Sequence, residues 1–442
     1  MRDGWQGLGV AELGRAIGAG EIDPVALTDG YLAAIDAHPY RDRIYTVVTA
    51  ERARAEAAAA SDRARLGVRR GPLDGVPVSW KDLFDSAGDE TKAGSDLLSG
   101  RVPPMDAEVL AKATRAGMVC LGKTHMSELA FSGLGVNPVT ETPPNINDPE
   151  LVPGGSSSGA AASVAWGLAP AGIGSDTGGS VRIPSAYNNL VGLKTTAGRL
   201  SLQGVVPLAE SFDTVGPLAK TVEDCAALLA VMEGGKPVDL AGATVTGRRL
   251  LILDTYTDDV RPEPGAGFSN AVDKLAAAGA EISHGTVDGI VEAMDLAPIL
   301  FTSEAYGTWK HAIESAPEKM FPRILDRFRS GANFSAADYV AAWQWLEHLR
   351  GQWAAQVAGY DAVILPTAPN LPPHAARLLE DDAYYVTENL LTLRNTRVGN
   401  LMGLAALTLP TDVPGAGIMF LGQPFGEEAL LRLGKAAEAA LA

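Results

Sequence analysis

Apolar residues repeat along the chain with two spacings, and the first is the spacing of an amphipathic helix. Asp23-Pro24 has the residue types of a helix cap followed by a first-turn proline, and Leu27, Tyr31 and Ile35 then recur on one helical face. A stretch rich in alanine, arginine and glutamate follows. The pattern therefore predicts that residues 1–65 form an N-terminal helical segment.

The second spacing is the alternation of a β-strand. Val76, Val78 and Trp80 alternate with other residues, which predicts a short strand that turns Lys81 to the face opposite the valines. Further strands are predicted at residues 118–121, 168–173, 190–193, 250–253, 281–284 and 362–365. Helical stretches separate most of these runs, which is typical of an α/β protein with helices on both faces of one sheet.

The last third of the chain is predicted to be mostly helical. Residues from about 290 to 350 are rich in Trp, Phe and charged side chains, and we expect them to cover one side of the sheet. Residues 427–441 have the pattern of an amphipathic C-terminal helix. Because no repeat, low-complexity tail or flexible linker interrupts the chain, we expect one domain over residues 1–442, although the length alone would allow two or three.

Composition and charge exclude several classes of function. A net charge of −17 argues against a dedicated nucleic-acid binder, because such a protein needs a basic face. No apolar stretch reaches the length of a membrane span, so we expect no membrane insertion and a cytoplasmic location. Cys120 and Cys225 lie in apolar runs, which predicts buried reduced thiols. The 6 histidines lack metal-ligand spacing, so no catalytic metal is expected.

Two segments rich in glycine and serine, residues 152–163 and 172–184, carry the most informative chemistry. The first, which contains Gly-Gly-Ser-Ser-Ser-Gly, could by itself be a flexible linker or a helix N-cap. However, it lies between two buried-looking elements and leads at once into an alanine-rich helix. The second contains Gly-Ser-Asp-Thr-Gly-Gly-Ser and lacks both the third glycine and the Gly-Lys-Ser/Thr of phosphate-binding loops.

A competing motif overlaps the first segment. Residues 155–159 match Gly-x-Ser-x-Gly, the nucleophile elbow of α/β-hydrolases, which would make Ser157 the nucleophile of an esterase. That elbow directly follows a β-strand, whereas residues 147–153 have the composition of a loop. The structural context that the motif needs is therefore missing.

Together the two segments resemble the amidase signature, and the resemblance covers roughly residues 20–440. Residues 71–82 are similar to the lysine motif of that family. Further family landmarks are Gly122-Lys123-Thr124 and residues 189–194, 211–217, 365–369 and 400–404. The resemblance divides the single domain into the helical segment 1–65, a signature core over 66–235, and a variable cover with the C-terminal part of the sheet over 236–442.

The resemblance implies an amidase signature fold, a large twisted mixed β-sheet flanked on both faces by helices, and an amide hydrolase that forms an acyl-enzyme. In this family Ser180 would attack the carbonyl, Ser156 would pass the proton, and a neutral Lys81 would be the final base. The peptide bond before Ser156 would be cis. Backbone N–H groups from Thr177, Gly178, Gly179 and Ser180 would form the oxyanion hole. A small amide substrate, no cofactor and a homodimer are the family-level expectations.

Substrate contacts are expected from Gly154, Gly155 and Ser157. His125 stands where the family frequently has Asn, so it either faces the substrate or packs as a structural histidine. Two further departures, Ala160 for a frequent Ser and Thr195 for a frequent Pro, leave the three catalytic positions intact.

The chemistry requires an uncharged lysine. A serine hydroxyl needs a base within hydrogen-bond reach, and burial can lower a lysine pKa from about 10.4 by roughly 3–5 units. Without the other motifs, an ion pair with Asp82 would be the simplest role for Lys81. Two other functions stay open: the glutaminase-type subunit of a tRNA-dependent amidotransferase, which passes ammonia to a partner protein, and a catalytically silent binding scaffold.

Overall fold

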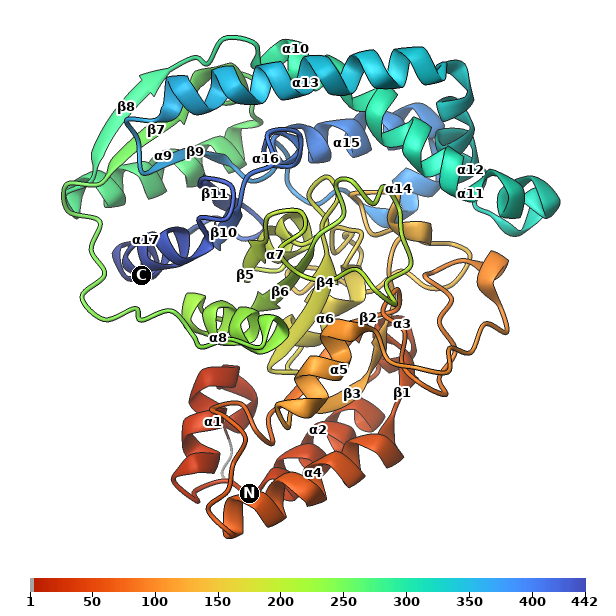
Figure 1. Cartoon of the computed structure of the whole chain (residues 1–442), viewed down its shortest axis with the longest axis vertical. Coiled ribbons are helices and arrows are strands. Elements are labelled where there is room, and N and C mark those ends of the chain that lie inside the picture. The colour runs from red at the N-terminus through yellow and green to blue at the C-terminus, as the bar shows by residue number, and fades with distance from the viewer. Residues whose placement is uncertain (1–3) are drawn as a thin grey trace.

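The computed structural model of the protein describes residues 4–442 and contains an 11-stranded mixed β-sheet (Figure 1). From one edge to the other the strands are β1 (Tyr45–Val48), β3 (Val119–Thr124), β2 (Pro77–Lys81), β4 (Ala171–Ser175), β6 (Val215–Ala219), β5 (Val191–Lys194), β10 (Ala406–Pro410), β11 (Gly417–Leu421), β9 (Ala362–Pro366), β7 (Arg249–Leu253) and β8 (Glu281–Gly285). Strand β2 is parallel to both β3 and β4, and β7 is parallel to both β8 and β9. The strands between these two groups pair antiparallel.

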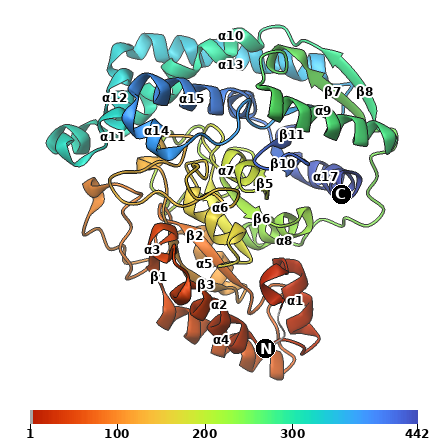
Figure 2. The same cartoon turned by 180° about the vertical axis from the view of Figure 1, so that it is seen from behind.

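Helices pack on both faces of this sheet, as the sequence predicted. They are α1 (Val10–Gly18), α2 (Pro24–Ala37), α3 (Arg41–Ile44), α4 (Ala50–Arg65), α5 (Glu108–Arg115), α6 (Ser158–Ala165), α7 (Arg182–Tyr187), α8 (Val222–Glu233), α9 (Pro262–Ala277), α10 (Ile290–Asp295), α11 (Ser303–Ser315), α12 (Pro322–Arg329), α13 (Ala336–Val357), α14 (Ala375–Glu380), α15 (Asp382–Arg394), α16 (Thr396–Leu401) and α17 (Glu427–Leu441). Helices α1, α2 and α4 lie at one end of the molecule, and α11, α12 and α13 lie toward the other end (Figures 1 and 2).

Strand β7 shows how one sheet divides the core into two layers. Leu250 and Ile252 pack in one apolar cluster with side chains from α5, α8, α9 and α17. Leu251 and Leu253 pack in a second cluster with side chains from α10, α13 and α16. Successive side chains of a strand point to opposite faces, so a continuous apolar run is what a strand covered on both faces requires.

Several local predictions are confirmed. The predicted cap at Asp23 is present, because its Oδ1 accepts the backbone N–H of Val25 at 2.9 Å at the start of α2. The C-terminal helix spans the predicted residues 427–441. Cys120 and Cys225 are buried free thiols. Among residues 4–442, no helix is both long and apolar enough to cross a bilayer.

Other local predictions are wrong or incomplete. The N-terminal segment 1–65 is not entirely helical, because β1 pairs with β3 at the edge of the sheet. This strand has four residues and only Tyr45 is buried, so it carries almost no alternating pattern. Strands β6, β10 and β11 were not predicted either. Strand β6 contains Gly216 and Pro217, residue types that are depleted in strands.

Candidate active site

Lys81 is the last residue of β2 and is completely buried. Its Nζ donates to Ser156 Oγ at 2.7 Å and to Ser175 Oγ at 2.8 Å. Strands β2 and β4 are parallel neighbours in which Trp80 pairs with Ile173, so the carboxyl ends of both strands meet at one edge of the sheet. The sheet therefore brings Lys81 and Ser175 together, and the loop that carries Ser156 supplies the third group.

The surroundings of Lys81 favour its neutral form. Burial lowers the pKa of Lys81 to about 7, although the negative charges of Asp176 and Asp213 act in the opposite direction. The simpler role, an ion pair with Asp82, is wrong. The Asp82 carboxylate lies 2.7 Å from the ammonium of Lys123, which comes from the neighbouring strand β3. Lys81 is thus free to act as a base near neutral pH.

The loop before α6 carries the first signature segment. The Gly155–Ser156 peptide bond is cis, as the resemblance implied. Gly155 N–H donates to the Gly133 carbonyl at 2.7 Å, and the Ser156 carbonyl accepts from Ser127 N–H at 3.1 Å. These main-chain bonds fix the loop on both sides of Ser156, whose side chain is fully buried against Lys81.

Ser157 is a structural residue in this loop. It is fully buried, its Oγ donates to the Ser175 carbonyl at 3.2 Å, and the same Oγ accepts from Ser175 N–H at 3.3 Å. The loop that contains it follows no strand directly, since β3 ends far upstream at Thr124. The nucleophile-elbow interpretation is therefore wrong, because it needs both a preceding strand and an exposed serine.

Ser180 lies in the second signature segment, between β4 and α7, and 4% of its surface is exposed. Its carbonyl accepts the N–H of Ser157 at 3.2 Å, so a main-chain bond joins the two signature segments directly. Within residues 4–442, no hydrogen bond links Ser180 Oγ to Ser156 Oγ. The structure thus brings Lys81 and Ser156 into contact and places the Ser180 loop beside them.

Three of the four predicted oxyanion donors have a free N–H. The Gly179 N–H donates to Asp176 Oδ1 at 2.9 Å, so it is not available to a ligand. The N–H groups of Thr177, Gly178 and Ser180 have no acceptor within the described chain. These three belong to one tight loop next to the candidate nucleophile, which is the arrangement that stabilises a developing oxyanion.

A buried ion pair holds this loop in place. Asp176 accepts from Gly179 N–H and Val181 N–H, from the Arg182 guanidinium at 2.9 and 3.0 Å, and from the Asn400 amide at 2.9 Å. Burial alone would raise the pKa of Asp176, but the charge and hydrogen bonds of Arg182 hold this pKa well below its usual range. The carboxylate is therefore fully ionised at neutral pH and fixes the direction of the loop's N–H groups.

The loop opens onto a narrow pocket that Thr177, Gly178 and Ser180 line on one side. The other lining residues are the apolar Ala130, Phe131, Leu208, Phe301 and Leu393, together with Ser132, Arg327 and Arg397. The free volume is about 30 Å³, which is room for only a few water molecules. A substrate must therefore be small or must displace some of these side chains.

The predicted substrate contacts are not among the residues that line this pocket. Gly154 has φ +76° and packs against Pro184 and Tyr187. His125 lines a different pocket, where its Nε2 lies 3.1 Å from the Asp42 carbonyl. Burial lowers the pKa of His125 to about 4, so it is neutral at pH 7. The structure thus supports the structural role for this histidine.

Sequence reasoning missed two kinds of residue at the site. Ser175 had a signal, because it stands two residues after the predicted strand 168–173 and inside the second signature segment. Arg327 and Arg397 had no local signal, because they reach the pocket from α12 and α16, in the variable part of the chain.

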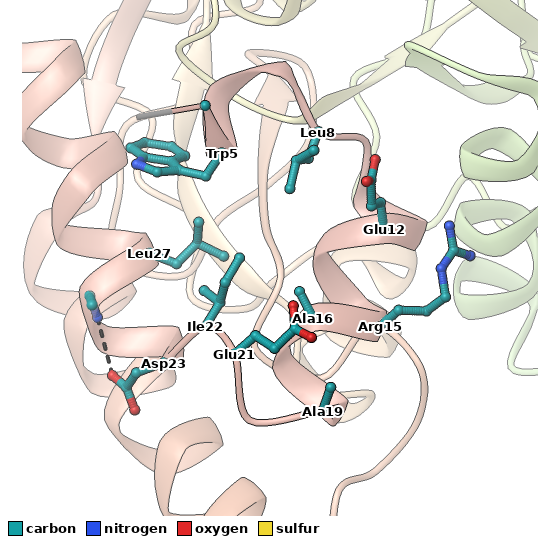
Figure 3. Close-up of a pocket in the computed structure, with 12 residues that line it drawn as sticks. Trp5, Leu8, Glu12, Arg15, Ala16, Ala19, Glu21, Ile22, Asp23 and Leu27 are labelled. Atoms are coloured by element: carbon teal, nitrogen blue, oxygen red, sulfur yellow. Dashed lines mark hydrogen bonds between the residues drawn. The ribbon is translucent and has the colours of Figure 1, made fainter. Parts of the chain in front are cut away.

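A wider cavity of about 610 Å³ lies between α1 and α2 (Figure 3). Trp5, Leu8 and Leu27 line it, with Glu12 and Arg15 at its rim. No serine, cysteine, histidine or lysine occurs in its lining within residues 4–442, so it offers no hydroxyl or thiol nucleophile of the kind that the signature segments supply. The described chain also contains no cluster of three or more metal-ligating side chains.

Comparison with known proteins identifies the family of the chain. The amidase family model matches residues 26–431, so the chain belongs to the amidase family. It is similar to the 2-amino-5-chloromuconic acid deaminase of Comamonas testosteroni, with 34% identity over 98% of this chain and 96% of that protein. It is also similar to a glutamyl-tRNA(Gln) amidotransferase subunit of Roseiflexus sp. (strain RS-1), with 32% identity over 97% of this chain and 95% of that protein.

The fold of the chain is also similar to solved structures of this family. A crystal structure of an amidase matches the fold with a TM-score of 0.89 and 30% sequence identity, covering 98% of this chain and 100% of the other. The fold class expected from the sequence, an α/β amidase signature fold, is thereby confirmed.

Proposed function

We propose that the protein hydrolyses the C–N bond of a small linear amide through an acyl-enzyme on Ser180. The observation that carries the proposal is the contact between two buried groups, Lys81 Nζ and Ser156 Oγ, at 2.7 Å. Lys81 has no carboxylate partner and contacts two serine hydroxyls, and a pKa of about 7 suits it to the role of the base.

In the first half of the reaction Lys81 takes the proton of the Ser156 hydroxyl, and Ser156 takes the proton of Ser180. The Ser180 oxygen forms a bond to the amide carbon, and the carbonyl oxygen becomes an oxyanion that faces the N–H groups of Thr177 and Gly178. The proton then returns through Ser156 to the amide nitrogen. The C–N bond breaks, ammonia or an amine leaves, and the acyl group remains on Ser180.

In the second half a water molecule takes the place of the amine. It gives one proton to Lys81 through Ser156, and its oxygen bonds to the acyl carbon. The bond to Ser180 then breaks, Ser180 recovers a proton by the same route, and the free acid leaves. No proton donor beyond these three side chains is needed, and no cofactor takes part.

The test is release of ammonia or amine from a panel of small primary amides, secondary amides, ureas and amino-acid amides. Wild-type protein should hydrolyse at least one class, and Ser180→Ala should lose at least about 1,000-fold in kcat/KM. Ser99→Ala is the matched control, because Ser99 is a serine outside the pocket. Equal activity of wild type and Ser180→Ala would contradict the proposal.

A second candidate is the glutaminase component of an amidotransferase, which the similarity to the Roseiflexus amidotransferase protein favours. In that function L-glutamine would be the substrate, and ammonia would pass to a partner protein. Hydrolysis of simple amides by the purified chain alone, at rates above those for L-glutamine, would exclude it.

A further inference from the structure

Two arginines line the pocket at Ser180 without a carboxylate partner. Arg327 reaches the pocket from α12, and Arg397 reaches it from α16. Within the part of the chain that the structure describes, neither guanidinium lies within 4.0 Å of an Asp or Glu oxygen. In a protein with a net charge of −17, two unneutralised cations in one pocket are a distinct feature.

Arg397 lies directly beside the loop that carries the free N–H groups. Its Cγ is 3.8 Å from the point that a Cβ on Gly178 would occupy. The preceding residue, Thr396, donates from Oγ1 to the Gly178 carbonyl at 2.7 Å, which fixes α16 against this loop. The Arg397 guanidinium donates no hydrogen bond to any residue in the range 4–442, so all five of its N–H donors are available.

Arg327 is partly held by the protein. Its Nη1 donates to the Phe131 carbonyl at 3.0 Å, and its guanidinium carbon lies 4.4 Å from the centre of the Phe131 ring. These contacts fix the position of the guanidinium and leave its other N–H groups free. Burial lowers the pKa of Arg327 to about 10, and burial with the Arg327 charge lowers the pKa of Arg397 to about 9. Both are therefore charged at pH 7 and repel each other.

Two buried carboxylates at the Ser180 loop are already engaged by other groups. Asp176 is saturated by Arg182, Asn400 and the backbone of its own loop. Asp213 accepts from Thr177 Oγ1 at 2.5 Å and from the N–H of Leu208 at 2.9 Å. Holding two like charges in a largely buried pocket is costly unless an anion neutralises them when the site is in use.

We propose that Arg327 and Arg397 bind a carboxylate on the acyl part of the substrate, so that the enzyme prefers short amides of dicarboxylic acids. The inference rests on the proposed function, because it names the substrate class of the same site. A guanidinium matches the planar, two-oxygen geometry of a carboxylate. Because Arg397 and Gly178 line the same narrow pocket, the inference favours substrates in which only a few bonds separate the carboxylate from the scissile carbonyl.

The experiment compares two primary amides of similar size and shape, succinamate and 4-methylpentanamide, which differ by a carboxylate in place of an isopropyl group. Wild-type kcat/KM should favour succinamate. Arg397→Met and Arg327→Met should each lower this preference by about 10- to 150-fold, the value of a hydrogen bond to a charged group, and mainly through KM. Arg397→Lys keeps the positive charge and should lose less of the preference for succinamate than Arg397→Met.

The matched control is Arg329→Met, on the same helix α12, whose guanidinium pairs with Glu314 at 2.7 Å outside the pocket. It should keep the wild-type preference. A wild-type preference for 4-methylpentanamide, or an equal loss with both amides in the two pocket variants, would overturn the inference and leave the amidase proposal standing.

A second readout does not depend on turnover. Succinamate should slow the modification of Ser180 by a fluorophosphonate at concentrations where 4-methylpentanamide does not, and Arg397→Met should abolish this protection. Absence of protection in wild type would overturn the anionic-substrate inference. Failure of Ser180 to react at all, with or without amide, would instead overturn the proposed function.

Discussion

The most informative perturbation is the removal of the amine at position 81. The pKa of Lys81 falls from an ordinary 10.5 to about 7 because the side chain is buried. The difference between these two pKa values corresponds to about 5 kcal/mol of free energy that disfavours the charged form. At pH 7 roughly half of the molecules would then hold a neutral lysine, whereas an unshifted lysine would be neutral in only about one molecule in 3,000.

A neutral Lys81 near pH 7 has two consequences, one for the activity lost on its removal and one for the pH dependence of kcat/KM. Lys81→Ala should lower kcat/KM by at least about 1,000-fold, since the base is removed and not merely protonated. Wild-type log kcat/KM should rise with a slope of one below pH 7 and level off above about pH 8, because deprotonation of Lys81 creates the active form. The assay is ammonia release from a primary amide that the panel identifies, measured from pH 5 to 9.

A second buried lysine provides the control for this assignment. Burial also lowers the pKa of Lys194 to about 7, but its Nζ donates to the Thr195 and Leu404 carbonyls at 2.8 Å, away from the serines. Lys194→Met should therefore keep the inflection near pH 7. A flat wild-type profile between pH 6 and 8, or an inflection that disappears in Lys194→Met, would refute the reasoning.

Four further predictions concern the groups around the site. Asp176→Ala should reduce the free energy of unfolding in urea by about 3–5 kcal/mol, because it leaves Arg182 buried without its partner; a loss below 1 kcal/mol would contradict this. Since the pKa of Asp176 is depressed, wild-type stability should be intact above about pH 4 and fall below it, and acid titration of unfolding checks the sign. His125→Gln should lower the free energy of unfolding by about 1 kcal/mol and leave KM within about threefold of wild type. A large rise in KM would indicate instead that His125 contacts the substrate. Gly155→Ala should destabilise the fold by about 1–3 kcal/mol, because its Cβ would lie 2.5 Å from Ser127 Oγ; an unchanged melting temperature would show that the loop can yield.

The parts of the fold that could be predicted from the sequence are those with a strong local signal. Strand β2 and helix α17 have clear periodicity. The lysine motif at residues 71–82 led to Lys81 and the first signature segment led to Ser156, and the structure places the two side chains in contact. Strand β1 has too few buried positions to show the alternating pattern of a strand. Strand β6 contains Pro217, a residue type that argues against a strand in the sequence.

The rest of the site depends on contacts that only the folded sheet creates. Ser175 reaches Lys81 because β2 and β4 are parallel neighbours. Arg327 and Arg397 meet at one pocket from two helices of the variable region, where no spacing rule connects them. The same limit applies to His125. Because it stands where the family frequently has Asn, the sequence left a substrate contact and a structural role open, and the burial of its ring beside Asp42 could not be inferred from its neighbours in the chain.

The central claim is that Ser180 is a nucleophile whose proton leaves through Ser156 to Lys81. The most direct measurement is intact-mass and peptide-level mass spectrometry after reaction with a fluorophosphonate. We predict one adduct, located on Ser180, which is absent in Ser180→Ala and forms far more slowly in Lys81→Ala. An adduct on Ser157, equal labelling of wild type and Lys81→Ala, or no adduct at all would contradict the account.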